Sequence, residues 1–104
     1  MDIKQFEQIV AKLDDDCDSI LLDREKEYAG KDRLESFKQI EFLTGVPAPM
    51  VCLVAQAKHI IAIFKAVREG RYDNLRKYTV DIINYQRLLT AILEEETPEV
   101  ILGP

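Results

Sequence analysis

The polar residue that is hardest to explain in this sequence is Asp81, which falls on an apolar helical face. Projecting residues 73–95 at about 100° per residue gathers most polar side chains on one side: Arg76, Thr79, Gln86, Arg87, Thr90 and Glu94. Asp81 lies near the centre of the remaining apolar arc, with Asn84 beside it one turn later. A carboxylate is costly to bury without a partner. Asp81 is therefore either a core residue in a salt bridge or helix cap, or a metal or substrate ligand inside a helical bundle.

The segment 49–69 also carries polar groups among apolar ones. It has two apolar sides, so we expect the helix to be largely enclosed. Ile63, Cys52 and Ala66 form the second side, and the main stripe contains Met50, Leu53, Val54, Ala57, Ile60, Ile61, Phe64 and Val67. His59 lies on a second apolar side, where a lone histidine is more typical of a hydrogen-bonded core or interface residue than of a ligand. One histidine without paired cysteines does not favour a zinc site. Lys58 is a cation that could meet either Asp81 or a phosphate.

Two further carboxylates, Asp23 and Glu27, share one helical face at a spacing of four residues. Such a pair can hold Mg²⁺ through oxygen ligands, but the neighbouring Arg24 and Lys26 favour a solvated, salt-bridged face equally well. A nearby acidic run is predicted to form a solvent-exposed face: Asp14, Asp15, Asp16 and Asp18. The sequence has no glycine-rich phosphate loop and no pattern typical of a nucleophile triad.

These residues require helices to position them. Apolar residues recur with a helical period in four segments, and no segment alternates like an exposed strand. Asp2 and Asp73 are predicted N-caps, and Gly30 is predicted to end the first helix. The expected fold is a single all-α domain, an antiparallel four-helix bundle with short connections, whose segments are 3–28, 33–43, 49–69 and 73–95, followed by a tail over 96–104.

Composition narrows the classes of partner. The chain has 104 residues and is 47% hydrophobic, and so small a domain leaves much apolar surface uncovered, so we expect a homo-oligomer, a dimer or tetramer, to complete the bundle. The net charge of −5 disfavours a nucleic-acid partner, because binding to its phosphates requires a basic surface. We expect no membrane span and no signal peptide, hence a cytoplasmic protein. Cys17 and Cys52 lack metal or redox spacing and are predicted to be small core residues.

Three stretches together resemble a known group of proteins. The sequence is similar over residues 21–93 to the small phage and bacterial domains called nucleotide-modification-associated, and through them to the all-α nucleoside triphosphate pyrophosphatase superfamily, the MazG-like proteins. The resemblance is carried by Arg24, Glu27 and Tyr28 in DREKEYAG, Phe37, Lys58 in AKHI, and Asp81 to Tyr85 in DIINY. It implies a helical oligomer with a Mg²⁺-dependent site that cleaves a nucleotide between its α and β phosphates. The acidic EExxE pattern of the MazG-like enzymes is absent here.

Two functions follow as hypotheses. In the first, the chain is a nucleotide pyrophosphohydrolase or a nucleotide-binding relative: Asp81 with Glu27 or Asp23 would hold Mg²⁺, and Lys58 would stabilise phosphate charge. Substrate contacts would then come from neighbouring polar and aromatic residues, namely Tyr28, His59, Asn84 and Tyr85. In the second, it is a phage- or prophage-type helical oligomer without catalysis, a module that binds a protein partner, or a nucleotide without turning it over.

Overall fold

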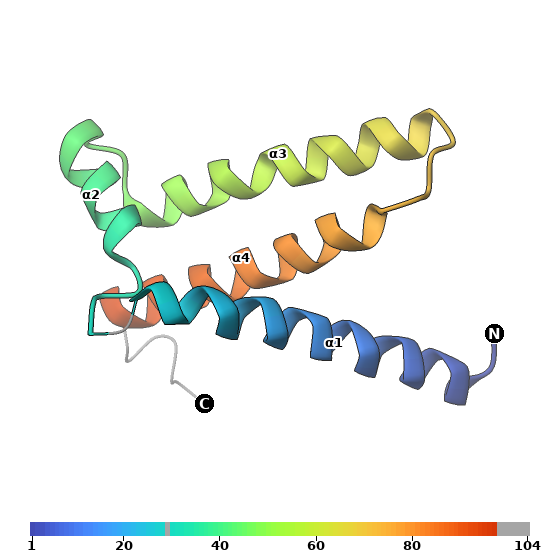
Figure 1. The fold of residues 1–104 in the computed structure, drawn as a ribbon. Coiled ribbons are helices and arrows are strands. Elements are labelled where there is room, and N and C mark those ends of the chain that lie inside the picture. Colours follow the sequence, from blue (N-terminus) through green and yellow to red (C-terminus); the bar gives the residue numbers. More distant parts are fainter. Residues whose placement is uncertain (29, 98–104) are drawn as a thin grey trace.

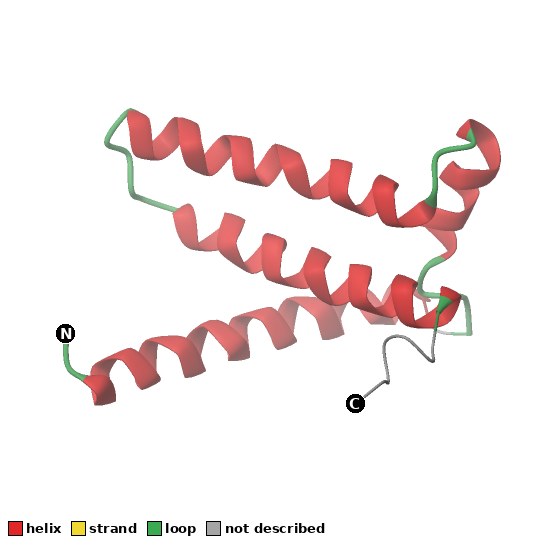
Figure 2. Cartoon of the chain, turned by 180° about the vertical axis from the view of Figure 1, so that it is seen from behind, coloured by secondary structure: helices red, strands yellow, loops and turns green. Residues whose placement is uncertain are grey.

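The computed structural model describes residues 1–28 and 30–97, and within them it contains helices and loops but no strand (Figure 2). The expectation of an all-α chain is therefore confirmed for these residues. In chain order the elements are α1 (Ile3–Glu25), the short 3₁₀ helix η1 (Lys26–Tyr28), α2 (Glu35–Thr44), α3 (Ala48–Arg68) and α4 (Leu75–Glu96) (Figure 1).

The helix ends follow the sequence signals at some positions and depart from them at others. Asp2 caps α1 as predicted: its carboxylate accepts from the Gln5 backbone N–H at 2.7 Å, and the Gln5 side chain accepts from the Asp2 N–H at 3.0 Å. The prediction that Asp73 caps the last helix was wrong. Asn74 occupies that position with φ 62°, and α4 begins at Leu75, because asparagine tolerates the left-handed backbone conformation that this turn requires. Of the predicted tail, residues 98–104 lie outside the described residues.

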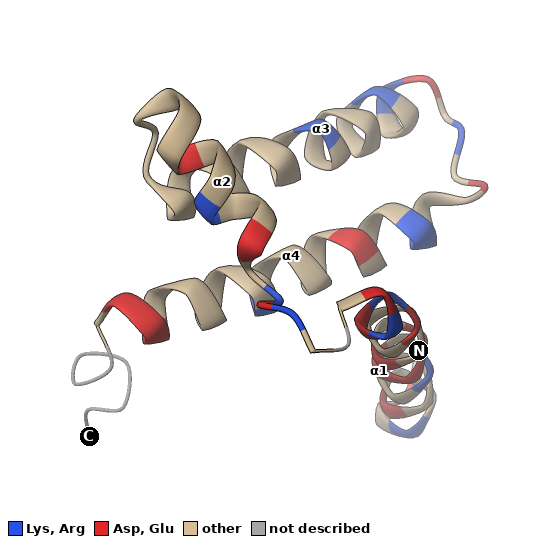
Figure 3. Cartoon of the chain, turned by 60° about the vertical axis from the view of Figure 1, so that its left-hand side comes forward, with Lys and Arg blue, Asp and Glu red and all other residues tan. Residues whose placement is uncertain are grey.

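The central helix is α4, which lies between α1 and α3 (Figure 1). Its neighbour along the chain, α3, runs beside it in the opposite direction, while the short α2 packs against α3. When the molecule is viewed nearly along α1, α4 runs across the view, so these two helices cross steeply rather than lying side by side (Figure 3). The N-terminal part of α1 extends beyond the start of α4 (Figure 1).

The core is built from few and mostly small side chains. The buried apolar residues are Cys17, Leu34, Ala48, Cys52, Ala66, Val80 and Ile92. Both cysteines are free and have no exposed surface, which confirms them as core residues. Burial raises the pKa of both thiols, because the thiolate is poorly solvated in the interior. Such cysteines are expected to be chemically inert in the folded chain.

The prediction that α3 is largely enclosed is wrong for the single chain. Its main apolar stripe is exposed, with Ile61 and Phe64 each at 66%, and the opposite face packs against α4 through Ala48, Cys52, Gln56 and Ala66. Helical periodicity identifies an apolar face but does not say which of two such faces meets the neighbouring helix. By length and composition alone, α3 is also suited to crossing a membrane, a property that the core helix of a soluble protein can share.

Candidate functional site

Seven of the eight predicted site residues line a single cavity of about 380 Å³. It is bounded by the end of α1, η1, the start of α2, and the facing sides of α3 and α4. The seven residues come from η1, α3 and α4: Glu27, Tyr28, Lys58, His59, Asp81, Asn84 and Tyr85. Segments separated by more than fifty residues in the sequence thus supply one site. The eighth residue, Asp23, does not line this cavity.

Asp81 of α4 and His59 of α3, the two polar residues predicted on apolar helical sides, lie next to each other. The Asp81 Oδ2 lies 3.6 Å from the His59 Nδ1, and their side chains are 29% and 15% exposed. This distance is too long for a hydrogen bond, but it allows an ion pair when the imidazole is protonated. Aromatic rings surround the histidine, with the Tyr85 ring centroid at 5.5 Å and the Tyr78 centroid at 6.2 Å. Asp81 is therefore partly buried beside a group that can carry a proton or a positive charge.

Lys58 is placed differently from His59, although the two are adjacent in the sequence. Its side chain is exposed and lines the cavity, and within residues 1–28 and 30–97 no ion pair involving it is found. Asp81 lies beside His59 instead. Of the two partners considered for Lys58, the structure therefore does not bring the carboxylate to it, and the ammonium group faces the cavity in which a ligand anion could bind.

Asn84 has a structural role in joining two helices. Its Nδ2 donates to the Cys17 carbonyl of α1 at 3.1 Å, and Arg87 donates to its Oδ1 at 3.4 Å. The residue is only 8% exposed. Although it lines the cavity, its amide already satisfies a buried backbone carbonyl, so its predicted contact with a substrate gains no support from this geometry.

A cation that the sequence analysis did not single out contributes to the site. The Arg33 guanidinium carbon lies 4.4 Å from the centroid of the Tyr28 ring, a distance typical of a cation–π contact. Its Nε is buried and has no hydrogen-bond partner among the described residues. A buried donor without an acceptor is unfavourable, so an acceptor oxygen placed in this cavity would be stabilised. Arg33 follows the turn after Gly30, and no spacing pattern in the sequence marks it.

The predicted metal ligands are not gathered into a metal centre. Asp23 is 73% exposed and lies 3.6 Å from the Lys26 Nζ. Glu27 and Asp81 do line the same cavity, but within the described ranges no three His, Cys, Asp or Glu side chains are close enough to hold an ion. The residues present therefore do not fit a protein-held Mg²⁺. That ion usually keeps several waters and is bound by one or two carboxylates together with substrate phosphates.

Part of the acidic run in α1 forms ion pairs with α4. Asp16 accepts from Arg76 at 2.8 Å, and Asp18 accepts from Arg87 at 2.8 Å, so two of its carboxylates connect α1 to α4. The pairs are well exposed, and ion pairs in such positions contribute little free energy of folding. Their effect is to orient α1 across α4 rather than to form a cation site.

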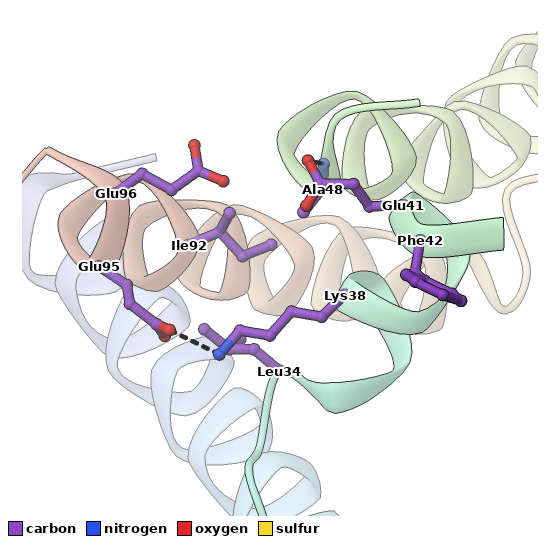
Figure 4. A pocket seen from close by; sticks show the side chains of 8 residues that line it. All are labelled: Leu34, Lys38, Glu41, Phe42, Ala48, Ile92, Glu95 and Glu96. Atoms are coloured by element: carbon purple, nitrogen blue, oxygen red, sulfur yellow. Dashed lines mark hydrogen bonds and ion pairs between the residues drawn. The ribbon is translucent and has the colours of Figure 1, made fainter. Parts of the chain in front are cut away.

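A second cavity, of about 490 Å³, lies between α2 and the C-terminal part of α4 (Figure 4). Its charged groups are largely satisfied within the chain. The Lys38 Nζ donates to Glu95 at 2.5 Å and to Asp32 at 2.6 Å, while the Glu41 carboxylate accepts from the Ala48 N–H at 3.2 Å. Three glutamates line this cavity against one lysine. It is therefore a poor site for an anionic ligand, and the first cavity is the better candidate.

No protein-family model matches this sequence, and neither a curated protein nor a solved structure similar to it was found. The resemblance to the pyrophosphatase superfamily therefore stays a prediction. Residues 1–28 and 30–97 form helices and loops, with a cavity that combines basic and aromatic side chains where the helices meet.

Proposed function

We propose that this protein binds a small phosphorylated ligand, a nucleotide, in the cavity between η1, α2, α3 and α4. The observation that carries the proposal is the convergence of three cations, from α1, from the turn before α2 and from α3: Arg24, Arg33 and Lys58. Two carboxylates, Glu27 and Asp81, line the same cavity. The cavity is thus more basic than the chain, whose net charge is −5, and this contrast favours an anionic ligand.

The residue types also suit the two chemical parts of a nucleotide. Arginine presents a planar set of donors that matches phosphate oxygens, and the unpartnered Arg33 Nε is such a donor. Lys58 adds a further positive charge from α3. The rings of Tyr28 and Tyr85 offer flat apolar surfaces for a base, which is how aromatic side chains commonly hold bases. Asp81 can accept a hydrogen bond from a sugar hydroxyl or a base amino group.

Binding, rather than metal-dependent hydrolysis, is the function that these contacts favour. Cleaving a phosphoanhydride requires neutralised phosphate charge and a positioned water. Glu27 and Asp81 line this cavity, but among the described residues no three His, Cys, Asp or Glu side chains gather to hold an ion. Under this proposal Mg²⁺ enters only with the phosphates of the ligand. The test below therefore measures binding and turnover separately.

We also infer that the protein acts as an oligomer in which other copies complete the helical bundle. The chain exposes 7725 Å², whereas a folded monomer of 12.0 kDa exposes about 6,000 Å². The excess is accompanied by many exposed large apolar side chains on α1 and α3. These surfaces also favour the second candidate function, a module that binds a protein partner.

The binding proposal is tested by calorimetric titration of the full chain with ATP, ADP and AMP, each with and without Mg²⁺. We expect saturable binding that also raises the thermal midpoint, because a ligand of the native state stabilises it by mass action. Lys58→Gln should weaken binding about tenfold, the loss of one charge-assisted contact. The matched control is Lys65→Gln on the same helix, which does not line this cavity and should leave affinity unchanged within about twofold.

Two outcomes would contradict the proposal. The first is that none of these nucleotides binds; the second is that both lysine variants bind as the unsubstituted chain does. Phosphate and pyrophosphate release from the triphosphate is followed in the same samples. Mg²⁺-dependent turnover that Asp81→Asn abolishes would replace binding by pyrophosphohydrolase activity as the function of this cavity.

A further inference from the structure

The side of α3 that points away from α4 forms a continuous apolar surface, which we call the outer face. Its seven large side chains are between 39% and 66% exposed: Met50, Leu53, Val54, Ile60, Ile61, Phe64 and Val67. At 1.5 Å per residue, this face extends for roughly 25 Å along the helix. The intrachain contacts of α3 are made with α2 and α4, and they leave these side chains open.

The size of the outer face matches that of a protein interface. From the exposed fractions, its seven side chains present roughly 600 Å², against about 800 Å² per partner in a standard protein–protein interface. A patch of this size lies at the upper limit for an ordinary monomer and marks an interaction site. Neighbouring side chains along α3 can supply the remaining area.

We propose that a second copy of this chain covers the outer face, through an antiparallel contact of the two α3 helices about a two-fold axis. The proposal rests on the oligomer inferred above and adds its surface and its orientation. In such a contact the same patch serves both copies, so apolar side chains meet apolar side chains. No residue of α3 is acidic, and no carboxylate would be buried within the helix pair.

Charge selects the antiparallel orientation. The cations of α3 are Lys58, Lys65 and Arg68, two of them in its last turn. In a parallel pair, Lys65 and Arg68 would lie beside their own counterparts, and the two helix dipoles would be aligned side by side. An antiparallel pair places Lys65 and Arg68 of the two copies at opposite ends and opposes the dipoles, both of which are favourable. Lys58 lies near the midpoint, so its position does not select either orientation.

A second copy is a better occupant than a membrane surface. The cytoplasmic face of a membrane attracts clustered basic residues, whereas this chain has a net charge of −5. The opposite side of α3 is already packed against α4, so the helix is apolar and free on one side only. That arrangement suits a helix pair.

The first experiment measures the mass of the full chain by sedimentation equilibrium over a range of concentrations. We expect a dimer, twice the 12.0 kDa chain mass. The double variant Ile61→Glu, Phe64→Glu should raise the dimer dissociation constant by at least about 30-fold, as expected when central apolar anchors are lost. The control Phe42→Glu, on α2 at 88% exposure, should remain dimeric. Circular dichroism verifies that each variant stays helical.

The second experiment tests orientation through disulfide cross-linking. Ala57→Cys lies near the midpoint of the outer face and should cross-link two copies. Met50→Cys should not, because two such residues would be about 25 Å apart in an antiparallel pair. The native Cys17 and Cys52 are fully buried, so the unsubstituted chain serves as the background sample. Cross-linking of both variants would show a parallel pair and overturn the orientation.

The outcomes separate this inference from the proposed oligomer. A chain that is monomeric at every concentration contradicts both. An oligomer that survives the double variant, or that Phe6→Glu in α1 breaks instead, leaves the oligomer standing and overturns the outer face as its contact. A monomer that binds phosphatidylserine vesicles through the same residues would assign the face to a membrane and overturn the proposal.

Discussion

In a core helix the large apolar side chains are expected on the buried face, but on α3 they lie on the exposed face. The face packed against α4 carries small or polar side chains, Ala48, Cys52, Gln56 and Ala66. The outer face carries the larger apolar ones, and they are exposed. Because burial of apolar area is the main favourable term in folding, a helix that served one chain alone would have these faces exchanged. This difference is the basis for our proposal that a second copy of the chain covers the outer face.

The inner face also differs in how it makes its contacts. Gln56 is 4% exposed and accepts a hydrogen bond from Gln86 of α4 at 2.7 Å. The Cys52 Sγ lies 3.4 Å from the Tyr85 carbonyl, to which it donates. Small side chains allow α3 and α4 to approach, and polar groups then meet across the contact. The side of α3 that packs against α4, its inner face, therefore depends on close packing and hydrogen bonds. The outer face provides mainly exposed apolar area.

The largest expected effect comes from placing one charge on each face at adjacent positions. Ala66→Glu puts a carboxylate at a site that is 5% exposed and should destabilise the fold by about 3 kcal/mol or more. Val67→Glu, at 48% exposure, should change the stability of the monomer by less than about 0.5 kcal/mol. Thermal and urea unfolding, followed by circular dichroism below the dimer dissociation constant, compare the two. Equal losses would remove the distinction between the faces.

A smaller effect is expected on the other side of α4, where Asn84 holds α1. Asn84→Ala removes the side-chain hydrogen bond to the Cys17 carbonyl. That carbonyl lies inside α1 and keeps its helical bond from the N–H four residues later, so the expected cost is about 0.5–1.5 kcal/mol. Urea unfolding measures the change. The control is Thr79→Ala, an exposed polar residue of the same helix, which should cause no loss. If Asn84→Ala were equally harmless, α1 would be held by its exposed ion pairs and the contrast with α3 would weaken.

The parts of the molecule that the sequence predicted are those governed by local spacing. Apolar residues with a period of 3.6 located four helices, and Asp2 before the first apolar residue predicted the N-cap of α1. Asp81 and His59 stood out because each interrupts an apolar side, and both line the cavity. A polar residue in an apolar arc is thus a useful signal for a site even when its partner is unknown.

The parts that could not be predicted depend on distant neighbours. The side of α3 that meets α4 is set by how two helices pack, and both sides of α3 are apolar enough for either choice. Arg33 reaches the cavity because the chain turns after Gly30, which has φ 74°, and helical spacing carries no information about where such a turn leads. Asn74 replaces Asp73 at the start of α4 for a similar reason: the loop decides which residue takes the left-handed conformation.

A still smaller effect should follow when the polar character of the inner face is removed. Gln56→Leu replaces a buried amide with an apolar side chain of similar size. The partner Gln86 is exposed, so water can replace the lost contact, and the stability should change by less than about 1 kcal/mol in either direction. Differential scanning calorimetry gives the comparison, with Gln86→Ala as the matched variant. A loss as large as that of Asn84→Ala would show that this hydrogen bond, and not shape, holds α3 against α4.

The smallest effect is expected where α2 meets the end of α4, because the groups there are well exposed. The Lys38 side chain donates to Asp32 and Glu95. Hydrogen bonding to Asp32 and then to Glu95 raises the pKa of Lys38. The hydrogen bond from Lys38, followed by that from the Leu34 backbone N–H, lowers the pKa of Asp32 below its usual 3.8. The contribution of Lys38 to the free energy of unfolding is fully present below its unfolded pKa and is lost only at very alkaline pH. The contribution of Asp32 is present above pH 3.8 and is lost as the pH falls through the lowered pKa of the folded chain.

Lys38→Met should therefore lower the thermal midpoint only slightly at neutral pH, since solvent screens exposed pairs. It should also reduce the fall in stability below pH 3.8, because without Lys38 the pKa of the Asp32 carboxyl in the folded chain would be lowered only by the Leu34 N–H. Thermal unfolding between pH 2 and pH 7 tests both points, with Lys4→Met at the far end of α1 as the control. A strong effect at neutral pH would mean that α2 is held by this pair rather than by its apolar contacts. The contrast between polar and apolar contacts drawn for α3 would then extend to α2 as well.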